Sequence, residues 1–369
     1  MSLLQRLKAG GPKRMLALDG GGIRGALTAG YLVEMEKLLR QRHGNPQLVL
    51  ADYFDFIGGT STGSIIAAGL AIGMSAQGVS DAYLKLGAAG FKKVLLPFKA
   101  RFSADAVRAQ LQLLFGDRLL GDDSLRSALC VVAKRADTNS VWPILNHPEG
   151  KYYPRNSLMP LRDVIRASTA APTYFIPETL DVGGQAGAFI DGGVSMANNP
   201  ALTMFLVATL QGFPFHWKTG EDQLLLVSLG TGQWRQQKLP QDVSDANIIA
   251  SAAAVPEMLM QDANWHNQLL LQALSRCPTR AIIDREVGDL GGELLTPAPL
   301  LHYLRYNATL ETDALRALGL PHLSARAEAL HDMSDADNRH ELLEVGLTAA
   351  RQQLQGSHFP SAFDLPPRA

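Results

Sequence analysis

The chain has 369 residues, of which 46% are hydrophobic and 19% are charged, and its formal net charge is −1. These values exclude a disordered chain and give no electrostatic reason to expect a nucleic-acid polymer as a partner. The length suits one large domain or two domains of ordinary size.

The N-terminal residues and the cysteines indicate the compartment. The opening stretch MSLLQRLKAGGPKR is too short and too polar for the apolar region of a signal peptide. The most apolar run, IIAAGLAIGM, has ten residues, about half the length that a membrane-spanning helix needs. Cys130 and Cys277 lie far apart in apolar stretches, which is typical of a reduced compartment. We therefore expect a cytoplasmic protein whose contact with a membrane is peripheral.

Strand and helix patterns alternate along most of the chain. Short apolar runs predict buried strands, and apolar residues that recur every three or four positions predict helices. The first strand, at 15–18, is followed by a helix in which Leu27, Tyr31, Met35 and Leu38 share one face. This alternation predicts an α/β fold with helices on both faces of the sheet. Further strands are expected at 53–57, 129–133, 141–145, 188–190, 224–229 and 281–283, and further helices at 64–72, 161–167, 201–210 and 256–274.

The first strand leads into the glycine-rich stretch DGGGIRG, residues 19–25. Consecutive glycines before a helix can turn several backbone N–H groups toward one point, where the helix dipole also favours negative charge. The glycines also satisfy G-x-G-x-x-G, so a dinucleotide site and a purely structural turn are alternatives. A dinucleotide site, however, usually has an acidic residue at the end of the next strand, and this chain has none there. As an oxyanion hole, the loop would use Gly20, Gly21, Gly22, Arg24 and Gly25.

The next strand and helix are joined by GTSTG, in which Gly59, Ser61 and Gly63 form the pattern G-x-S-x-G. In a nucleophile elbow of this form, a strand turns sharply into a helix and projects a strained serine hydroxyl. Glycine suits both flanking positions because the turn requires close backbone approach. An ordinary glycine-rich turn is the alternative, and an ATP-binding P-loop is disfavoured by the missing lysine. Ser61 is therefore the candidate nucleophile, and it needs a partner.

The better candidate for the base is Asp191, far along the chain from Ser61. It ends a short apolar strand, and Gly192 and Gly193 leave its carboxylate accessible. An aspartate with the ordinary pKa near 4 is a weak base, so this pair would depend on an apolar pocket and on stabilisation of the oxyanion. A turn-forming Asp-Gly is the structural alternative. A Ser-His-Asp esterase is the chemical alternative, although no histidine lies in a strand-to-loop context typical of catalysis.

The segment from Tyr83 to Phe102 combines lysines and arginine with apolar and aromatic side chains and contains no acidic residue. Such a pattern is typical of contact with an anionic membrane surface. The segment could equally be a lid over the site, or its aromatic residues could be core residues with a solvated rim of lysines.

The chain contains no internal repeat and no long low-complexity linker. Residues 233–245 are polar and predict a loop, and the chain from about Leu294 onward has mainly helical patterns. We expect an N-terminal segment at 1–13, a catalytic domain at 14–232, and a mainly helical extension at 233–369 that packs on the same domain.

Four motifs together resemble the patatin-like phospholipase family. DGGGIRG, GTSTG, ASTAAPTYF at 167–175 and IDGG at 190–193 occur in the order and spacing of that family. The resemblance covers roughly 14–232 and implies a three-layer α/β/α domain with a mainly parallel sheet. It implies that Ser61 is the acylated nucleophile, that Asp191 is the proton acceptor, that the loop at 20–25 is the oxyanion hole, and that no metal is needed. The implied activity is hydrolysis of acyl esters of membrane glycerophospholipids.

The C-terminal part, with LHYLRYNATLE at 301–311, resembles a bacterial branch of the family. Some members of that branch are effectors of anti-phage (CBASS) systems, which degrade the membrane of the infected cell on receiving a cyclic dinucleotide from a partner synthase. The resemblance implies a cyclic dinucleotide as activator, no other cofactor, and peripheral binding at the inner membrane in the active state. The oligomeric state stays open, with a homo-oligomer as one alternative. A lysophospholipase without nucleotide control and a catalytically idle lipid-binding scaffold are the alternatives.

Overall fold

The computed structural model describes residues 2–90, 104–172, 174–235, 241, 248–282 and 290–366. Its centre is a nine-stranded sheet with the order β5-β6-β3-β2-β1-β7-β9-β8, and β4 pairs with β3. Five strand pairs are parallel and three, all of which involve β3 or β6, are antiparallel. The strands are β1 (Lys13–Leu18), β2 (Phe56–Thr60), β3 (Ala128–Arg135), β4 (Ser140–Leu145), β5 (Glu178–Val182), β6 (Gln185–Asp191), β7 (Leu224–Leu229), β8 (Ser275–Arg276) and β9 (Leu301–Tyr306).

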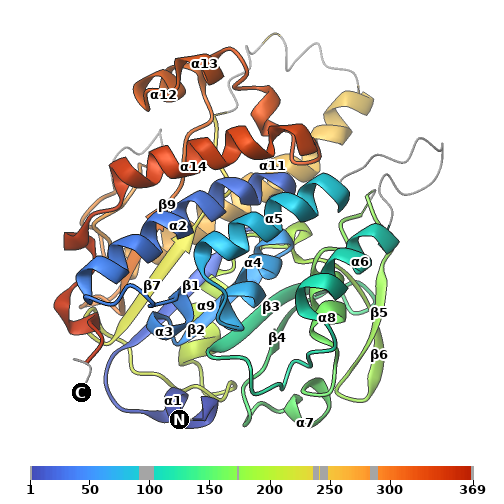
Figure 1. Ribbon diagram of the computed structural model, residues 1–369, viewed down its shortest axis with the longest axis vertical. Helices are drawn as coiled ribbons and strands as arrows, with labels where there is room; N and C mark the ends of the chain where they lie inside the picture. The colour runs from blue at the N-terminus through green and yellow to red at the C-terminus, as the bar shows by residue number, and fades with distance from the viewer. Residues whose placement is uncertain are drawn as a thin grey trace.

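Helices cover both faces of this sheet, which confirms the predicted three-layer α/β/α fold (Figure 1). Because side chains alternate along a strand, β1 serves two cores. Leu16 and Leu18 pack with α2 (Gly25–Arg42), α4 (Thr62–Ala71), α5 (Ala76–Gly90) and α14 (Arg339–Gln353). Met15 and Ala17 pack on the other face with α9 (Ala201–Thr209) and the end of α11 (Ile248–Ala273). The remaining α-helices are α1 (Leu3–Lys8), α3 (Leu50–Tyr53), α6 (Ala104–Phe115), α7 (Tyr153–Asn156), α8 (Leu161–Ser168), α12 (Thr312–Ala317) and α13 (Pro321–Ser324).

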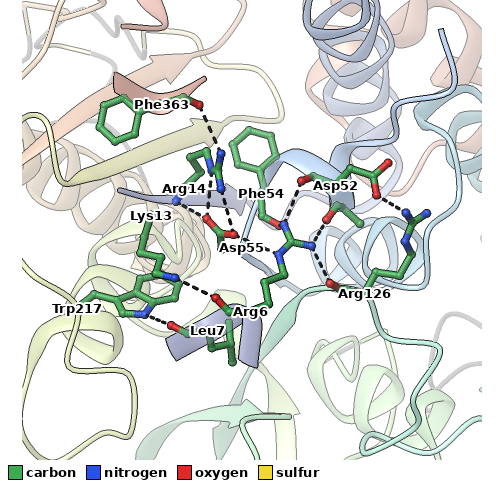
Figure 2. Close-up of polar contacts among 11 residues, drawn as sticks. Arg6, Leu7, Lys13, Arg14, Asp52, Phe54, Asp55, Arg126, Trp217 and Phe363 are labelled. Carbon is green, nitrogen blue, oxygen red and sulfur yellow. Dashed lines mark hydrogen bonds and ion pairs between the residues drawn. The ribbon is translucent and has the colours of Figure 1, made fainter. Parts of the chain in front are cut away.

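Several hydrogen bonds attach helix α1 to the N-terminal ends of the central parallel strands, and Arg6 makes most of them (Figure 2). The Arg6 guanidinium donates to the Asp55 carboxylate at 3.2 Å, and Asp55 also accepts from the backbone and side chain of Arg14. Nearby, the Trp217 indole donates to the Leu7 carbonyl at 3.2 Å. Arg6 therefore fixes α1 at the N-terminal ends of β1 and β2, whereas the predicted motifs follow the C-terminal ends of these strands. Its backbone acceptors are the carbonyls of Ala51, Asp52, Phe54 and Arg126.

Several expected elements differ from the structure. The strand predicted at 53–57 begins only at Phe56, because Asp52 accepts from the Val49 amide at 3.1 Å and residues 50–53 form α3. Ala281 and Ile282 are not in a strand, and Ile283 lies outside the described residues. The segment after 294, predicted as mainly helical, contributes β9 to the interior of the sheet. The domain boundary at 232 stays a prediction.

Candidate active site

Two strands bring Ser61 and Asp191 together by meeting end to end along one edge of β3. Strand β2 pairs with this edge up to Thr60, which is opposite Val132, and β4 occupies the other edge. Beyond Val132, β6 takes the place of β2 in the opposite direction, and Asp191 is opposite Ala133. The last residues of β2 and β6 are therefore neighbours in space although far apart in the sequence. The Ser61 hydroxyl donates a hydrogen bond to Asp191 Oδ2.

Ser61 has the strained backbone of a nucleophile elbow. Its φ of 54° and ψ of −130° lie in a region that residues with a side chain rarely adopt. The flanking glycines permit the sharp turn. A Cβ at Gly59 would lie 2.2 Å from the Gly63 carbonyl oxygen, and one at Gly63 would lie 2.5 Å from the Leu18 carbonyl oxygen. Ser64 secures the first turn of α4 by donating its hydroxyl to the Ser61 carbonyl at 2.6 Å.

A buried serine outside the predicted site holds the elbow in place. The Ser168 hydroxyl, at the end of α8, accepts from the Ser61 amide at 2.8 Å and donates to the Val132 carbonyl at 2.6 Å. It therefore occupies the position of a β2–β3 ladder bond at the point where the two strands separate. Two residues later, the Ala170 carbonyl accepts from the Asp191 amide at 3.0 Å. The segment 168–170 thus contacts the backbones of both Ser61 and Asp191.

The Asp191 carboxylate is buried and has two hydrogen-bond donors. Its Oδ2 accepts from Ser61, and its Oδ1 accepts from the Gly193 amide at 2.7 Å. Burial raises the pKa of Asp191 to about 6, while these donors and the nearby charge of Arg166 oppose the rise. A Cβ at Gly192 would lie 2.5 Å from the Val132 carbonyl oxygen, so glycine lets the chain pass close to β3. The result is a carboxylate more basic than an exposed aspartate.

The glycine loop 20–25 faces this pair, and its amides differ in availability. The Gly20 amide donates to the Asn198 carbonyl at 3.1 Å, the Arg24 amide donates to the Gly21 carbonyl at 3.1 Å, and the Gly25 amide bonds within its own turn. In the described part of the chain, the amides of Gly21 and Gly22 have no protein acceptor. Of the predicted loop residues, these two therefore offer free donors for an oxyanion.

Residues remote in sequence position the glycine loop. Asp19 forms a buried ion pair with Arg305 of β9, with oxygen–nitrogen distances of 2.9 and 2.6 Å. The Tyr83 hydroxyl of α5 donates to the Gly22 carbonyl, and the Met333 carbonyl accepts from the Ile23 amide at 2.8 Å. The loop is thus held by residues from both ends of the chain.

Ser61 and Asp191 open into a cavity of about 870 Å³. Part of its lining is apolar, with Ile65 next to the elbow and Ile190 next to Asp191. Polar lining residues come from α11, from the segments that follow β7 and β9, and from Asn198, although α11 also contributes the apolar Met260 and Trp265. The apolar lining also includes Leu86, Val107, Tyr174 and Phe175, and the polar lining includes Asn198, Thr231, Gln261, Asn264, Gln268 and Asn307.

The structure thus gathers Ser61, Asp191 and Gly193 around one cavity with Gly21, Gly22 and Arg24 of the glycine loop. The other predicted residues, which support the turns behind them, are not among the lining residues: Gly20, Gly25, Gly59, Gly63 and Gly192. Among the described residues, no histidine bonds to Ser61 or Asp191; His331 lines the cavity, but its ring stacks on Trp234 at 4.0 Å. No group of three metal-ligating side chains occurs in the described ranges. Sequence reasoning gave no site role to Ser168, Tyr83 or Arg305. Each lies in a stretch that the sequence analysis singles out, at 167–175, 83–102 and 301–311 respectively.

Two further observations concern membranes. No helix in the described part of the chain is long and apolar enough to cross a bilayer. Of the segment at 83–102, only residues 83–90, within α5, are described. Its assignment as a lid or a membrane contact therefore stays a prediction.

Comparison with known proteins gives a family model and several relatives. The model described as Patatin-like phospholipase matches residues 16–205. A protein of Escherichia coli named cGAMP-activated phospholipase is 27% identical over 232 residues, which cover 59% of this chain and 62% of that protein. A protein of the same name from Vibrio cholerae is 30% identical over 203 residues, which cover 51% of this chain and 55% of that protein. Patatin-07 from Solanum tuberosum is 30% identical over 236 residues, which cover 59% of this chain and 60% of that protein. The match therefore spans less than two thirds of each of these relatives.

Proposed function

This chain belongs to the patatin-like phospholipase family, and on that premise we propose that it hydrolyses acyl esters of membrane glycerophospholipids. The observation that carries the proposal is the hydrogen bond from the strained Ser61 hydroxyl to the buried Asp191 carboxylate. A serine nucleophile, an adjacent base and free amide donors around one cavity are the parts that acyl transfer requires.

In the first half of the proposed reaction, Ser61 Oγ attacks the ester carbonyl carbon while its proton passes to Asp191. With a pKa of about 6, Asp191 is mostly ionised at neutral pH and can accept this proton. The amides of Gly21 and Gly22 stabilise the oxyanion of the tetrahedral intermediate. When the intermediate collapses, Asp191 returns the proton to the departing alcohol oxygen, which leaves as the lysolipid, and Ser61 remains acylated.

In the second half, water attacks the acyl-enzyme and gives its proton to Asp191. The second tetrahedral intermediate expels Ser61 Oγ, which takes the proton back, and the fatty acid leaves. The apolar lining residues Ile65 and Ile190, beside the dyad, suit the acyl chain. The polar lining residues suit the glycerol and head group.

The test is fatty-acid release from phospholipid vesicles by purified wild-type protein and the Ser61→Ala variant. We expect the variant to lose release by at least about a thousandfold, because no nucleophile remains. A fluorophosphonate probe should label wild-type protein at Ser61 and leave the variant unlabelled. Wild-type turnover by Ser61→Ala would remove the dyad assignment. An unlabelled wild type without release would favour the lipid-binding scaffold.

We further propose that a cyclic dinucleotide activates the enzyme, and that the active enzyme binds peripherally to the inner membrane from the cytoplasm. The proposed activation is supported by two relatives that are named cGAMP-activated phospholipases. The vesicle assay, repeated with a panel of cyclic dinucleotides, tests this regulation. Release that requires one nucleotide would support it, whereas equal release without any nucleotide would favour a constitutive lipase.

A further inference from the structure

We infer that the cavity contains a subsite for the hydroxyl groups of a lipid head group, such as glycerol or a sugar. The subsite consists of carboxamide side chains from α11 and of Asn198. This inference rests on the proposed function and goes beyond it, because it names the class of head group that the enzyme prefers.

The first observation is a stripe of carboxamides on one face of α11. Gln261, Asn264 and Gln268 are spaced by three and four positions, which places them on the same side of a helix. All three line the cavity, and Gln268 is buried. Gln261 and Asn264 are half-buried, and Trp265 of the same helix also lines the cavity. Polar side chains that line a largely apolar cavity in this way can satisfy the hydrogen-bonding groups of a polar ligand.

The second observation is that this stripe continues to the nucleophile through Asn198. The Asn198 Nδ2 atom donates to Asn264 Oδ1 at 3.4 Å, which is a long hydrogen bond. A Cβ on Gly20 would lie 2.6 Å from Asn198 Oδ1 and 3.1 Å from Ser61 Cβ, so Asn198 and Ser61 flank Gly20. A lipid whose ester reaches Ser61 would therefore present its polar end to the stripe, with the acyl chain against apolar lining residues such as Ile65 and Ile190.

The third observation is that the carboxamides retain free hydrogen-bonding groups. An amide nitrogen has two donor hydrogens and an amide oxygen has two acceptor sites. In the described part of the chain, neither the Gln261 side chain nor Asn264 Nδ2 donates to a protein acceptor, and Gln268 donates only to Gln272 at 3.3 Å. Donors and acceptors side by side complement a hydroxyl, which needs both.

The carboxylates of the lining do not favour an ammonium head group. Asp19 is paired with Arg305, and Asp191 accepts from Ser61 and Gly193. Asp332 is exposed, and its Oδ1 accepts from the amide and hydroxyl of Ser334. A head group that ends in neutral hydroxyl groups is therefore a better match to this cavity than one that ends in an ammonium group.

The test compares phosphatidylglycerol with phosphatidylpropanol in detergent micelles, with the activating nucleotide added if release requires one. The two lipids have the same acyl chains and the same net charge, and only the first carries head-group hydroxyls. We expect wild-type kcat/KM to be about tenfold higher for phosphatidylglycerol, the scale of one or two neutral hydrogen bonds. The double variant Gln261→Leu, Asn264→Leu should bring the ratio close to one by slowing hydrolysis of phosphatidylglycerol. The double variant Gln77→Leu, Gln112→Leu removes two carboxamides outside the cavity and should keep the wild-type ratio.

Each outcome decides the inference. A wild-type ratio near one would overturn hydroxyl recognition, and a ratio that survives the α11 double variant would overturn the assignment to these residues. If the double variant does not fold, Gln261→Leu alone should lower the ratio, and an unchanged ratio would count against the subsite. Failure of the proposed function would look different, because wild-type protein would then hydrolyse neither lipid and a fluorophosphonate would not label Ser61.

Discussion

Opposing influences on the Asp191 carboxyl set the pH at which the proposed dyad can work. Burial raises its pKa to about 6, and the Ser61 hydroxyl, the Gly193 amide and the charge of Arg166 oppose the rise. The base form is lost as the pH falls through this value, so kcat/KM should fall about tenfold per pH unit below 6. Arg166 is buried in α8, with its guanidinium 4.4 Å from the Phe175 ring centroid. Arg166→Met should move this acid limb to higher pH.

The measurement is the pH profile of kcat/KM on a soluble ester. Arg162→Met is the matched control, because Arg162 is in the same helix but pairs with Asp117 at the surface. An acid limb that stays in place in Arg166→Met would show that Arg166 does not act on Asp191.

Burial of the ionised Asp191 carboxylate should also lower the stability of the folded protein at neutral pH. Because its pKa is higher in the folded protein than the 3.8 of a free aspartate, the folded state binds the proton more tightly, and stability falls as the pH rises from about 4 to 6. The cost above pH 6 is about 3 kcal/mol. Asp191→Asn, which cannot ionise, should therefore be inactive yet melt at a higher temperature than wild-type protein at pH 8. At pH 4 this advantage should vanish. A lower melting temperature at pH 8 would contradict the predicted cost.

Ser168 should matter more for reactivity than an ordinary buried serine. Ser168→Ala would leave the Ser61 amide and the Val132 carbonyl without their shared partner and free the elbow to shift. We expect fluorophosphonate labelling of Ser61 to slow by roughly tenfold to a hundredfold, because small misplacements of a nucleophile are costly. The loss of two buried hydrogen bonds should also destabilise the fold by about 1–3 kcal/mol.

Ser127→Ala is the control for this prediction. Ser127 is equally buried, its hydroxyl has no partner in the described structure, and it precedes β3 at the opposite end from the dyad. Labelling of Ser168→Ala at the wild-type rate would show that the bridge does not position the nucleophile.

At the scale of elements, α2 and α14 lie side by side in one helical layer (Figure 1), and two glycines mark the point where they cross. A Cβ at Gly346 would lie 2.1 Å from the Leu27 carbonyl oxygen, and one at Gly30 would lie 2.5 Å from the Leu347 amide nitrogen. Because the obstructing atoms belong to the backbone, Gly346→Ala must push the helices apart and should cost about 1–3 kcal/mol, measured by urea unfolding.

A helical glycine with more room is the control for this crossing. A Cβ at Gly78 of α5 would meet only the side chains of Ser75 and Met74, the nearer at 3.2 Å. Gly78→Ala should therefore be neutral or stabilise the protein by up to about 1 kcal/mol. Equal effects of the two substitutions would contradict close packing at the α2–α14 crossing.

Local sequence patterns predicted which segments form strands and helices better than they predicted how these segments pair and contact one another. The strand at 15–18 and the α/β alternation follow from short apolar runs, and Ser61 and Asp191 lie in recognisable strand-end motifs. That β2 and β6 meet end to end on β3 is set by the register of three strands and has no local signal. The role of Ser168 depends on a single hydroxyl, and Arg305 lies in a strand that was expected to be helical. The apolar side chains of Tyr53 and Phe54 suggested a strand, but the hydrogen bond between Val49 and Asp52 closes a helical turn there.

At the scale of the whole molecule, the family model covers residues 16–205, yet the site depends on residues far beyond it. Strand β9 pairs with the fully buried β7, and Arg305 of β9 neutralises the buried Asp19 at the start of the glycine loop. The Met333 carbonyl accepts from the Ile23 amide in the same loop. The C-terminal third is therefore part of the fold that positions the proposed oxyanion donors.

A fragment of residues 1–232 should accordingly fail to fold by itself. It would expose the edge of β7, leave Asp19 as a buried charge without its partner, and uncover the face of α2 that packs on α14, each of which costs several kcal/mol in a domain of marginal stability. We expect no cooperative thermal transition by circular dichroism and no fluorophosphonate labelling of the fragment. Residues 233–369, supplied as a second chain, should restore both if the loss is one of packing. A fragment that unfolds cooperatively and is labelled at Ser61 would instead make the C-terminal part a separable addition, whose contacts with the glycine loop would then adjust the reactivity of an already folded site.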